Sequence, residues 1–82
     1  MKIRQLRADT IRYLEERVLT AKWEKAKRLF EADMRYHSLK TELLEPRWRG
    51  IYSFRIDKKY RALFFITDGL VEVFAITNHY KK

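Results

Sequence analysis

The spacing of apolar residues changes at Gly50, and this change is the strongest constraint on what the chain can fold into. From Ile11 to Met34, apolar side chains recur every three or four residues, as they do along one face of an α-helix, and this period fades in the connector of residues 34–50. After Gly50, they alternate with polar side chains, as in a β-strand. Helices followed by strands are typical of the α+β class, in which helices cover one face of an antiparallel sheet. The pattern therefore predicts a two-layer domain.

The first helical segment carries Ile11, Leu14 and Val18 on one apolar stripe. Asp9 and Thr10 precede this stripe, and both are residue types that cap helix N-termini. We therefore expect a helix that starts at one of these two residues and runs through Val18.

The second helical segment follows Thr20, which is again a capping residue type. Trp23, Ala26 and Phe30 repeat the helical spacing. Aromatic side chains on an amphipathic stripe normally pack inward, so we expect Trp23 and Phe30 in the core. The two segments together predict a helical hairpin that packs on a sheet.

Three segments after Gly50 have the composition of strands that follow one another as antiparallel hairpins. Asp68-Gly69 is a strong signal for a tight turn, because glycine tolerates the positive φ that such turns require. The expected fold is α+β, a two-helix hairpin packed on a small twisted antiparallel sheet of three to four strands. The expected strands are residues 51–56, 60–66 and 70–77, with Asp57-Lys58-Lys59 as the first turn and residues 2–6 as a candidate edge strand.

Length and composition exclude several classes of protein. A chain of 82 residues is expected to form a single domain over residues 1–82. The chain has no cysteine, so it has neither a disulfide framework nor a thiolate metal site, and no other metal or cofactor motif is present. It also lacks an apolar run near the roughly 20 residues of a membrane span. We therefore expect a soluble, cytoplasmic protein with no cofactor and no membrane partner.

The net charge indicates a polyanionic partner. The chain carries 19 Lys and Arg against 11 Asp and Glu, a formal net charge of +8. Residues 1–44 and 45–82 contribute equally to this excess, so the positive field belongs to the folded body and not to a tail. A nucleic acid is the polyanion that such a field attracts most readily.

Arg55 and Arg61 flank the first predicted turn. Pairing about this turn puts them opposite or diagonal on neighbouring strands, where two like charges repel unless an anion or a carboxylate lies between them. A phosphate would satisfy both. The alternative is that one of them pairs with an acidic residue (Asp57, Glu45 or Glu72) and only borders the sheet.

His79 and Tyr80 follow the last predicted strand. An imidazole that titrates near neutral pH can give or take a proton, and a phenol can orient the proton carrier, so the pair is competent for acid-base chemistry. The alternative is a C-terminal tail that is solvated or packed on the sheet edge.

Arg47, Trp48 and Arg49 lie between Pro46 and Gly50 in the connector, where we expect exposure. Two guanidinium groups around an indole can hold phosphates and stack on a base, so these residues are candidates for RNA binding. The alternative is that Trp48 covers the edge of a small core.

The order of these features resembles the RelE/ParE toxin superfamily, and within it the RelE, YoeB and HigB-like mRNA interferases. The resemblance covers about residues 20–80. It is carried by a connector ending in LLEPRWRG, a strand with Arg55, Tyr60-Arg61, Asp68-Gly69 and the terminal His79-Tyr80. It implies a β-α-α-β-β-β fold and a plasmid-stabilising type II toxin. Such a toxin cuts messenger RNA in the ribosomal A site until a cognate antitoxin silences it.

The resemblance also implies roles for individual residues. Arg55 and Arg61 match the strand arginines of the family, and His79 and Tyr80 match the terminal pair of the YoeB branch. A catalytic carboxylate precedes the first hairpin strand in that branch, and Glu45 is the nearest candidate. Glu42 is the alternative carboxylate. The residues expected to contact messenger and ribosomal RNA are Arg47, Trp48, Arg49, Lys58, Lys59 and Lys81.

The implied reaction is attack by a ribose 2′-hydroxyl on its own 3′-phosphate, which needs neither a metal nor a protein nucleophile. Glu45 or His79 would take the proton, while Arg55 and Arg61 would hold the phosphate and Tyr80 would orient the reacting groups. Two other functions remain open at this point. One is a ParE-like toxin that inhibits DNA gyrase by binding, and the other is a non-catalytic relative that binds only an antitoxin.

Overall fold

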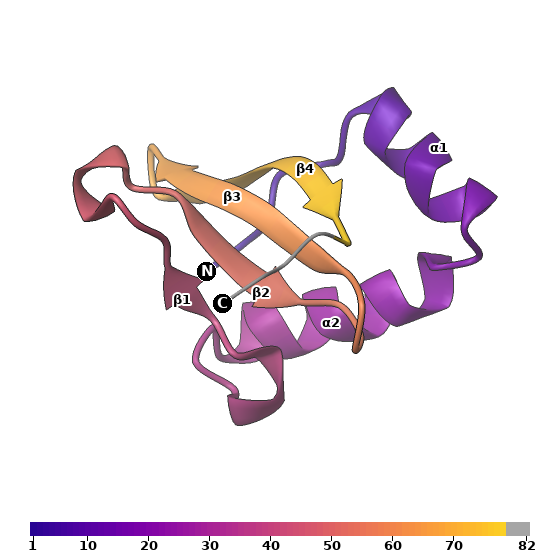
Figure 1. The fold of residues 1–82 in the computed structure, drawn as a ribbon, viewed down its shortest axis with the longest axis horizontal. Helices are drawn as coiled ribbons and strands as arrows, with labels where there is room; N and C mark the ends of the chain where they lie inside the picture. Colours follow the sequence, from indigo (N-terminus) through magenta and orange to yellow (C-terminus); the bar gives the residue numbers. More distant parts are fainter. Residues whose placement is uncertain (79–82) are drawn as a thin grey trace.

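A computed structural model of the protein describes residues 1–78 (Figure 1). Its α+β class and its antiparallel four-stranded sheet agree with the fold predicted from the sequence, but the element order is α-α-β-β-β-β and not the β-α-α-β-β-β that the resemblance implies. The helices are α1 (Ala8–Glu16) and α2 (Thr20–Ala32), with short 3₁₀ helices η1 (His37–Leu39) and η2 (Arg47–Arg49) in the connector. The strands are β1 (Glu42–Leu43), β2 (Tyr52–Arg55), β3 (Arg61–Thr67) and β4 (Leu70–Thr77).

The sheet has the order β1-β2-β3-β4, and every neighbouring pair is antiparallel. The turn at Asp68-Gly69 is confirmed: φ is 54° at Asp68 and 74° at Gly69, and Thr67 pairs with Leu70. Positive φ at both central residues is the geometry of a two-residue hairpin turn whose twist matches that of the strands. The turn closes β3 and β4 into a hairpin.

The fourth strand is the two-residue β1, which lies in the connector. It pairs with the start of β2 through Glu42 with Ser53 and Leu43 with Tyr52. Residues 2–6, the candidate edge strand, contribute a single parallel bridge between Ile3 and Val71 at the opposite edge of the sheet. Within residues 1–78, the N-terminal segment therefore covers β4 only at Val71, and β4 is otherwise an edge strand of the sheet.

The core lies between α2 and the sheet. The Phe30 ring centroid is 4.7 Å from that of Phe54 and 5.3 Å from that of Phe64, and Trp23 stacks on Phe54 at 5.9 Å. All four rings are buried. The prediction that Trp23 and Phe30 belong to the core is confirmed.

The helix ends differ from the prediction. α1 begins at Ala8, before both expected caps, and Arg7 at its N-cap makes no side-chain capping bond. Asp9 therefore lies inside the first turn, where the Arg7 guanidinium donates to it at 2.9 Å. Val18 is not on the apolar stripe, because α1 ends at Glu16 and Val18 takes a left-handed conformation with φ 56° and 87% exposure. Thr20 is likewise the first residue of α2 and not its cap.

Candidate functional site

Arg55 and Arg61 are direct partners across the β2–β3 hairpin. Residues opposite each other in an antiparallel pair point to the same face of the sheet, so the two arginines share a face. Phe54, which alternates with Arg55, points to the other face and packs in the core. The register thus shows that the two arginines lie directly opposite each other and not diagonally, a choice that the sequence left open.

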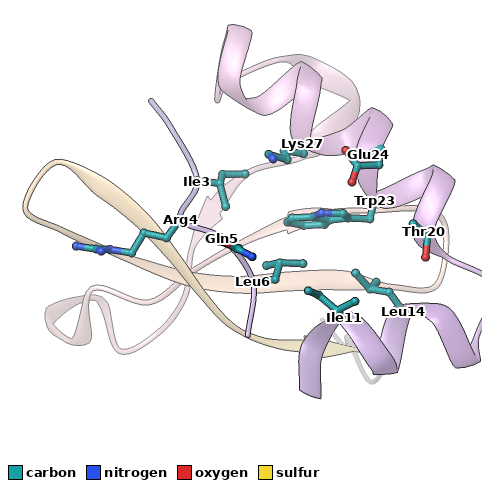
Figure 2. Close-up of a pocket in the computed structure, with 10 residues that line it drawn as sticks. All are labelled: Ile3, Arg4, Gln5, Leu6, Ile11, Leu14, Thr20, Trp23, Glu24 and Lys27. Carbon is teal, nitrogen blue, oxygen red and sulfur yellow. The ribbon is translucent and has the colours of Figure 1, made fainter. Parts of the chain in front are cut away.

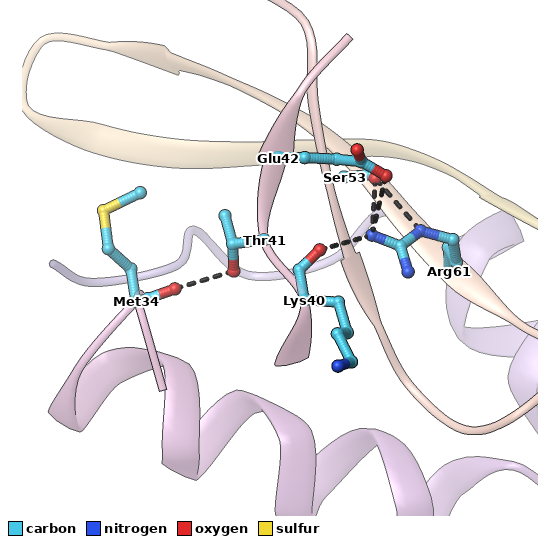
Figure 3. Close-up of polar contacts among 6 residues, drawn as sticks. All are labelled: Met34, Lys40, Thr41, Glu42, Ser53 and Arg61. Atoms are coloured by element: carbon cyan, nitrogen blue, oxygen red, sulfur yellow. Dashed lines mark hydrogen bonds and ion pairs between the residues drawn. The ribbon is translucent and has the colours of Figure 1, made fainter. Parts of the chain in front are cut away.

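The Arg61 side chain is 3% exposed and is held by three protein groups (Figure 3). Its Nε and Nη2 donate to Ser53 Oγ at 3.0 and 2.8 Å, and Nη2 also donates to the Lys40 carbonyl at 2.7 Å. The Glu42 carboxylate lies 3.6 Å from Nη2. Hydrogen bonds to a charged donor are the strong ones, so the guanidinium is fixed in position before any ligand arrives.

The connector holds these acceptors in place. The Thr41 hydroxyl donates to the Met34 carbonyl at 2.6 Å, which ties the connector to the chain just after α2 (Figure 3). Lys40 adopts a left-handed conformation with φ 50° and ψ 45°. Non-glycine residues rarely adopt that conformation, and the surrounding contacts must offset its cost. Pairing of Glu42 with Ser53 then sets the carboxylate beside the same guanidinium.

The electrostatic environment of Arg61 favours an anion. Burial lowers the pKa of its guanidinium, the nearby Arg55 lowers this pKa further, and Glu42 opposes both effects by stabilising the charged form. Arginine nevertheless stays protonated at neutral pH, because its ordinary pKa is far above 7. A partly desolvated, fixed cation interacts with an incoming anion more strongly than a solvated one does.

A depression of about 250 Å³ lies at this end of the hairpin. Four cationic side chains and one amide line it: Arg55, Lys58, Lys59, Arg61 and Asn78. Guanidinium and ammonium groups that converge in this way match the oxygens of a phosphate. We refer to this set of residues as the basic depression. His79, Tyr80 and Lys81, which the sequence also assigned to the site, lie outside the described residues.

Asp57 organises the turn that carries the two lysines. Its Oδ1 accepts from the backbone N–H groups of Lys59 and Tyr60, both at 2.8 Å, and its Oδ2 accepts from Lys22 Nζ at 3.1 Å. Burial raises the pKa of the Asp57 carboxyl, but the bonds from Tyr60, Lys59 and Lys22 outweigh this and bring it below its ordinary 3.8. The carboxylate is thus a structural group of the turn.

The basic surface continues around the hairpin toward α2. A second depression, of about 360 Å³, lies between α2 and the turn, and Arg55 and Lys58 line both depressions. Lys22 and Lys25 of α2 extend the lining on the helix side. Cations therefore extend from the paired arginines to one edge of α2, as a groove for a polyanion would require.

The acidic partners that the sequence offered for the arginines are engaged elsewhere. Asp57 binds Lys22, and Glu72 lies 3.4 Å from Arg4. Within residues 1–78, Arg55 takes part in no ion pair, and the carboxylate beside Arg61 belongs to Glu42. Within the described part of the chain, the alternative that one arginine pairs with an acidic residue is therefore right for Arg61, but its partner is Glu42 and not Asp57, Glu45 or Glu72.

Glu45 does not lie beside the arginines. It follows β1, whose residue Leu44 bonds through its N–H to the Ile51 carbonyl at 2.8 Å, so Glu45 belongs to the loop that enters β2. This hydrogen bond places Glu45 beside Gly50, just before β2. Arg55 follows Gly50 by five residues, which is about 16 Å at the rise of a strand. The structure thus brings Glu42, the alternative carboxylate, to Arg61, and separates Glu45 from the basic depression.

Arg47, Trp48 and Arg49 form η2 in that same distant loop. Trp48 is 85% exposed, so the alternative that its ring covers the edge of the core is wrong. The six candidate RNA-binding residues therefore divide. Lys58 and Lys59 lie at the basic depression, whereas the Arg-Trp-Arg turn lies at the opposite end of β2.

Sequence reasoning missed two groups that hold Arg61. Ser53 is fully buried and accepts two hydrogen bonds from it, and the Lys40 carbonyl accepts a third. Ser53 left a signal, because it is a small polar residue two positions before Arg55 on the same strand face. The backbone carbonyl left none, since its placement depends on the conformation of Lys40.

A larger pocket of about 480 Å³ lies between the N-terminal segment and the two helices (Figure 2). Its walls are mainly apolar, with Leu6, Ile11, Leu14 and Trp23 pointing into it (Figure 2). Its polar residues come from the N-terminal segment and from α2. It lacks the convergent cations of the basic depression, so it does not suit phosphate chemistry.

Two absences apply to residues 1–78. No helix there is long and apolar enough to cross a membrane. No group of three or more histidine, aspartate or glutamate side chains is gathered there in a way that could hold a metal ion.

Comparison with known proteins supports the fold. Neither a scan against protein families nor a search of curated proteins finds a match. Among solved structures, the chain is similar to a chain of the YoeB-YefM complex from Staphylococcus aureus, with a TM-score of 0.61 and 19% identity. The match covers 98% of this chain and 100% of that one. YoeB is a RelE-family toxin, so the resemblance in the sequence is confirmed at the level of the fold. The chain therefore shares the fold of the YoeB toxin.

Proposed function

We propose that this protein is the toxin of a type II toxin-antitoxin system and that it is a ribosome-dependent endoribonuclease that cleaves messenger RNA. One observation carries the proposal: Arg55 and Arg61 face each other across a hairpin, inside a depression lined by four cations. The carboxylate of Glu42 lies at its side, 3.6 Å from Arg61. The cleavage reaction exchanges one oxygen on phosphorus for another. It requires cations that stabilise the charge on the phosphate and a base that takes a proton, and the two arginines and the carboxylate supply these groups.

The chemistry follows from these groups. The ribose 2′-oxygen attacks the adjacent phosphorus, the bond from phosphorus to the 5′-oxygen breaks, and a 2′,3′-cyclic phosphate and a 5′-hydroxyl result. Glu42 takes the 2′-proton, while Arg55 and Arg61 stabilise the charge that builds on the phosphate oxygens. His79 protonates the leaving oxygen and Tyr80 orients it; both roles come from the family resemblance.

The fixed position of Arg61 supports a catalytic role for it. Electrostatic stabilisation is most effective when the donor need not reorganise as the charge develops. Ser53, Lys40 and Glu42 already restrain the guanidinium, so its rotamer entropy is lost during folding and not during the reaction. Lys58 and Lys59 then attract the RNA to the same end of the hairpin.

The partners follow from the same proposal. Messenger RNA and ribosomal RNA are the polyanions that a protein of charge +8 would meet on the ribosome. The partner that silences it is an antitoxin protein, as the YoeB-YefM complex suggests by its name. An acidic antitoxin would complement this charge and would compete with RNA for the basic depression.

The test is a cleavage assay on ribosomes programmed with a short message. The wild type is expected to yield a cut message with a 2′,3′-cyclic phosphate end. Glu42→Gln is expected to reduce the rate by about a hundredfold or more, the range of general-base catalysis. Glu45→Gln is the matched control, because it removes the same charge about 16 Å from the arginines along the sheet and should leave the rate within about twofold.

Two outcomes would contradict the proposal. If Glu45→Gln and not Glu42→Gln abolished cleavage, the assignment of the carboxylate would be wrong. If the protein arrested growth while messages stayed intact and DNA breaks depended on gyrase, the ribonuclease function itself would be wrong.

A further inference from the structure

The Arg-Trp-Arg turn is the part of the predicted site that the proposed cleavage reaction does not use. It lies in the loop between β1 and β2, near the Asp68-Gly69 hairpin, at the opposite end of the sheet from the turn of residues 57–60 (Figure 1). We propose that η2 (Arg47–Arg49) is a second RNA-binding site, in which Trp48 stacks on an unpaired base and the two arginines bind the flanking phosphates. This inference rests on the proposed function only in taking RNA as the polyanion.

The exposure of Trp48 is the first observation. Its side chain is 85% exposed, whereas the other tryptophan of the chain, Trp23, is 3% exposed. An indole in this position contributes little to the core, so folding does not account for its presence. Both faces of a base can stack on an aromatic ring, and such stacking stabilises binding of single strands without regard to sequence.

The geometry of the turn is the second observation. The Arg49 N–H donates to the Pro46 carbonyl and the Gly50 N–H donates to the Arg47 carbonyl, both at 3.1 Å. A 3₁₀ helix has three residues per turn, so consecutive side chains point about 120° apart. The arginines therefore lie to either side of the indole, and hydrogen bonds hold the Arg47 carbonyl and the Arg49 N–H that flank Trp48.

The charge of the turn is the third observation. Within residues 1–78, neither Arg47 nor Arg49 takes part in an ion pair, although other surface arginines such as Arg4 and Arg7 do. Both side chains are exposed. Two unneutralised guanidinium groups beside an exposed ring favour a phosphate-bearing ligand over an apolar surface, which a lone exposed tryptophan would suit equally well.

The chain offers its own probe for this site. Selective excitation of tryptophan gives an emission to which both Trp48 and Trp23 contribute. The contribution of the buried Trp23 serves as an internal reference. The ligand is a single-stranded oligonucleotide with 2′-O-methyl riboses, which the proposed reaction cannot cleave because its 2′-oxygen carries no proton. Saturation with this oligonucleotide is expected to quench the emission, and an equal length of duplex is expected to quench it much less.

Variants assign the effect to the turn. Trp48→Ala is expected to weaken binding about tenfold, within the range for one stacked base, and Trp48→Phe is expected to restore part of that loss. Arg47→Gln and Arg49→Gln are each expected to reduce the slope of log affinity against log salt by about 0.7. Arg12→Gln is the matched control, since it removes an exposed arginine on α1 and should not change quenching.

Failure of this inference is distinguishable from failure of the proposed function. Arg61→Ala is expected to abolish cleavage on ribosomes and to leave the quenching of Trp48 intact. If single strands did not quench Trp48, or if Trp48→Ala bound them as tightly as the wild type, the second site would be refuted whatever the cleavage assay gave. Quenching by an acidic protein partner and not by RNA would also refute it, because the turn would then be a protein contact.

Discussion

Arginines occur at both ends of β2, and the two ends treat them differently. At the C-terminal end of β2, across the hairpin, Arg61 of β3 is 3% exposed, bonded to Ser53 and to the Lys40 carbonyl, and close to Glu42. At the N-terminal end, in the loop that enters β2, Arg47 and Arg49 are exposed and only their backbone is held. The first end positions a charge, while the second only displays charges.

The difference separates two uses of the same residue type. A catalytic cation must be in place before the reaction, and restraining it costs stability elsewhere, here a left-handed lysine and a buried polar cluster. A binding cation can adjust to its ligand and needs no such support. The burial of the side chain, and not its identity, distinguishes the two.

Truncation of each end should give the largest contrast. Arg61→Ala is expected to lower the free energy of unfolding by about 2–4 kcal/mol, because it leaves the buried Ser53 hydroxyl and the Lys40 carbonyl without their donor. Trp48→Ala is expected to change it by less than about 0.5 kcal/mol, as exposed positions usually do. Urea unfolding of both variants checks this, and equal losses would show that the two ends do not differ in support.

Ser53→Ala should act on the site through Arg61. Removing the hydroxyl is expected to lower the free energy of unfolding by about 1–2 kcal/mol. It is also expected to lower kcat about tenfold with little change in KM, since Arg61 keeps its charge but loses its position. Ser38→Ala, at an exposed serine, is the matched control. A large change in KM with kcat unchanged would argue that Ser53 does not position Arg61 for the reaction.

Asp57→Ala should loosen the turn and remove a pH dependence. The carboxylate accepts two backbone hydrogen bonds, as at a helix N-cap, so its loss is expected to cost about 1 kcal/mol at neutral pH. The folded pKa of Asp57 lies below its ordinary 3.8, so its contribution is present above about pH 4 and disappears as the pH falls through the folded pKa.

Thermal unfolding of the wild type and Asp57→Ala from pH 7 to pH 2 measures this contribution. The difference in stability between the two proteins should shrink at acid pH. A difference that stays constant over this range would show that the carboxylate is not held in its ionised form by the turn.

Removal of a single charge should give the smallest effects. The effect on RNA binding should be equal at the two ends of β2, whereas the effect on cleavage should differ. Arg55→Gln and Arg49→Gln are each expected to lower the salt slope of RNA binding by about 0.7, because each removes one phosphate contact. Only Arg55→Gln is expected to reduce the cleavage rate. Equal losses of cleavage would place the Arg-Trp-Arg turn in the reaction and would end the distinction between the two ends.

Much of the fold follows from local patterns. The three strands after Gly50, the Asp68-Gly69 turn and the aromatic stripe of α2 depend on residue type and spacing, and the structure confirms them. The alternation predicted for β2 is only partly right, because Ser53 and Phe54, which point to opposite faces of the sheet, are both buried. Helix ends were less predictable. α1 starts at Ala8, and Asp9 accepts a hydrogen bond from the Arg7 side chain instead of capping the helix; nothing in the local sequence distinguishes these two arrangements.

The site was predicted in part. The position of Arg55 and Arg61 on one hairpin followed from the turn between them, but their shared face depended on the register of the pairing. A shift of one residue would have reversed it. The choice between Glu42 and Glu45 depended on the two-residue strand β1, which is too short to leave a periodic signal.

The sequence by itself determined the class of fold, the net charge of +8 and the residue types available for phosphate chemistry. These depend on composition and on short-range periodicity, which each segment carries on its own. Only the tertiary structure decided which groups meet: Arg61 with Ser53, the Lys40 carbonyl and Glu42, and Trp48 with solvent. Such contacts join residues up to 21 positions apart, and they form only when strand register and connector conformation are set together by the packed core.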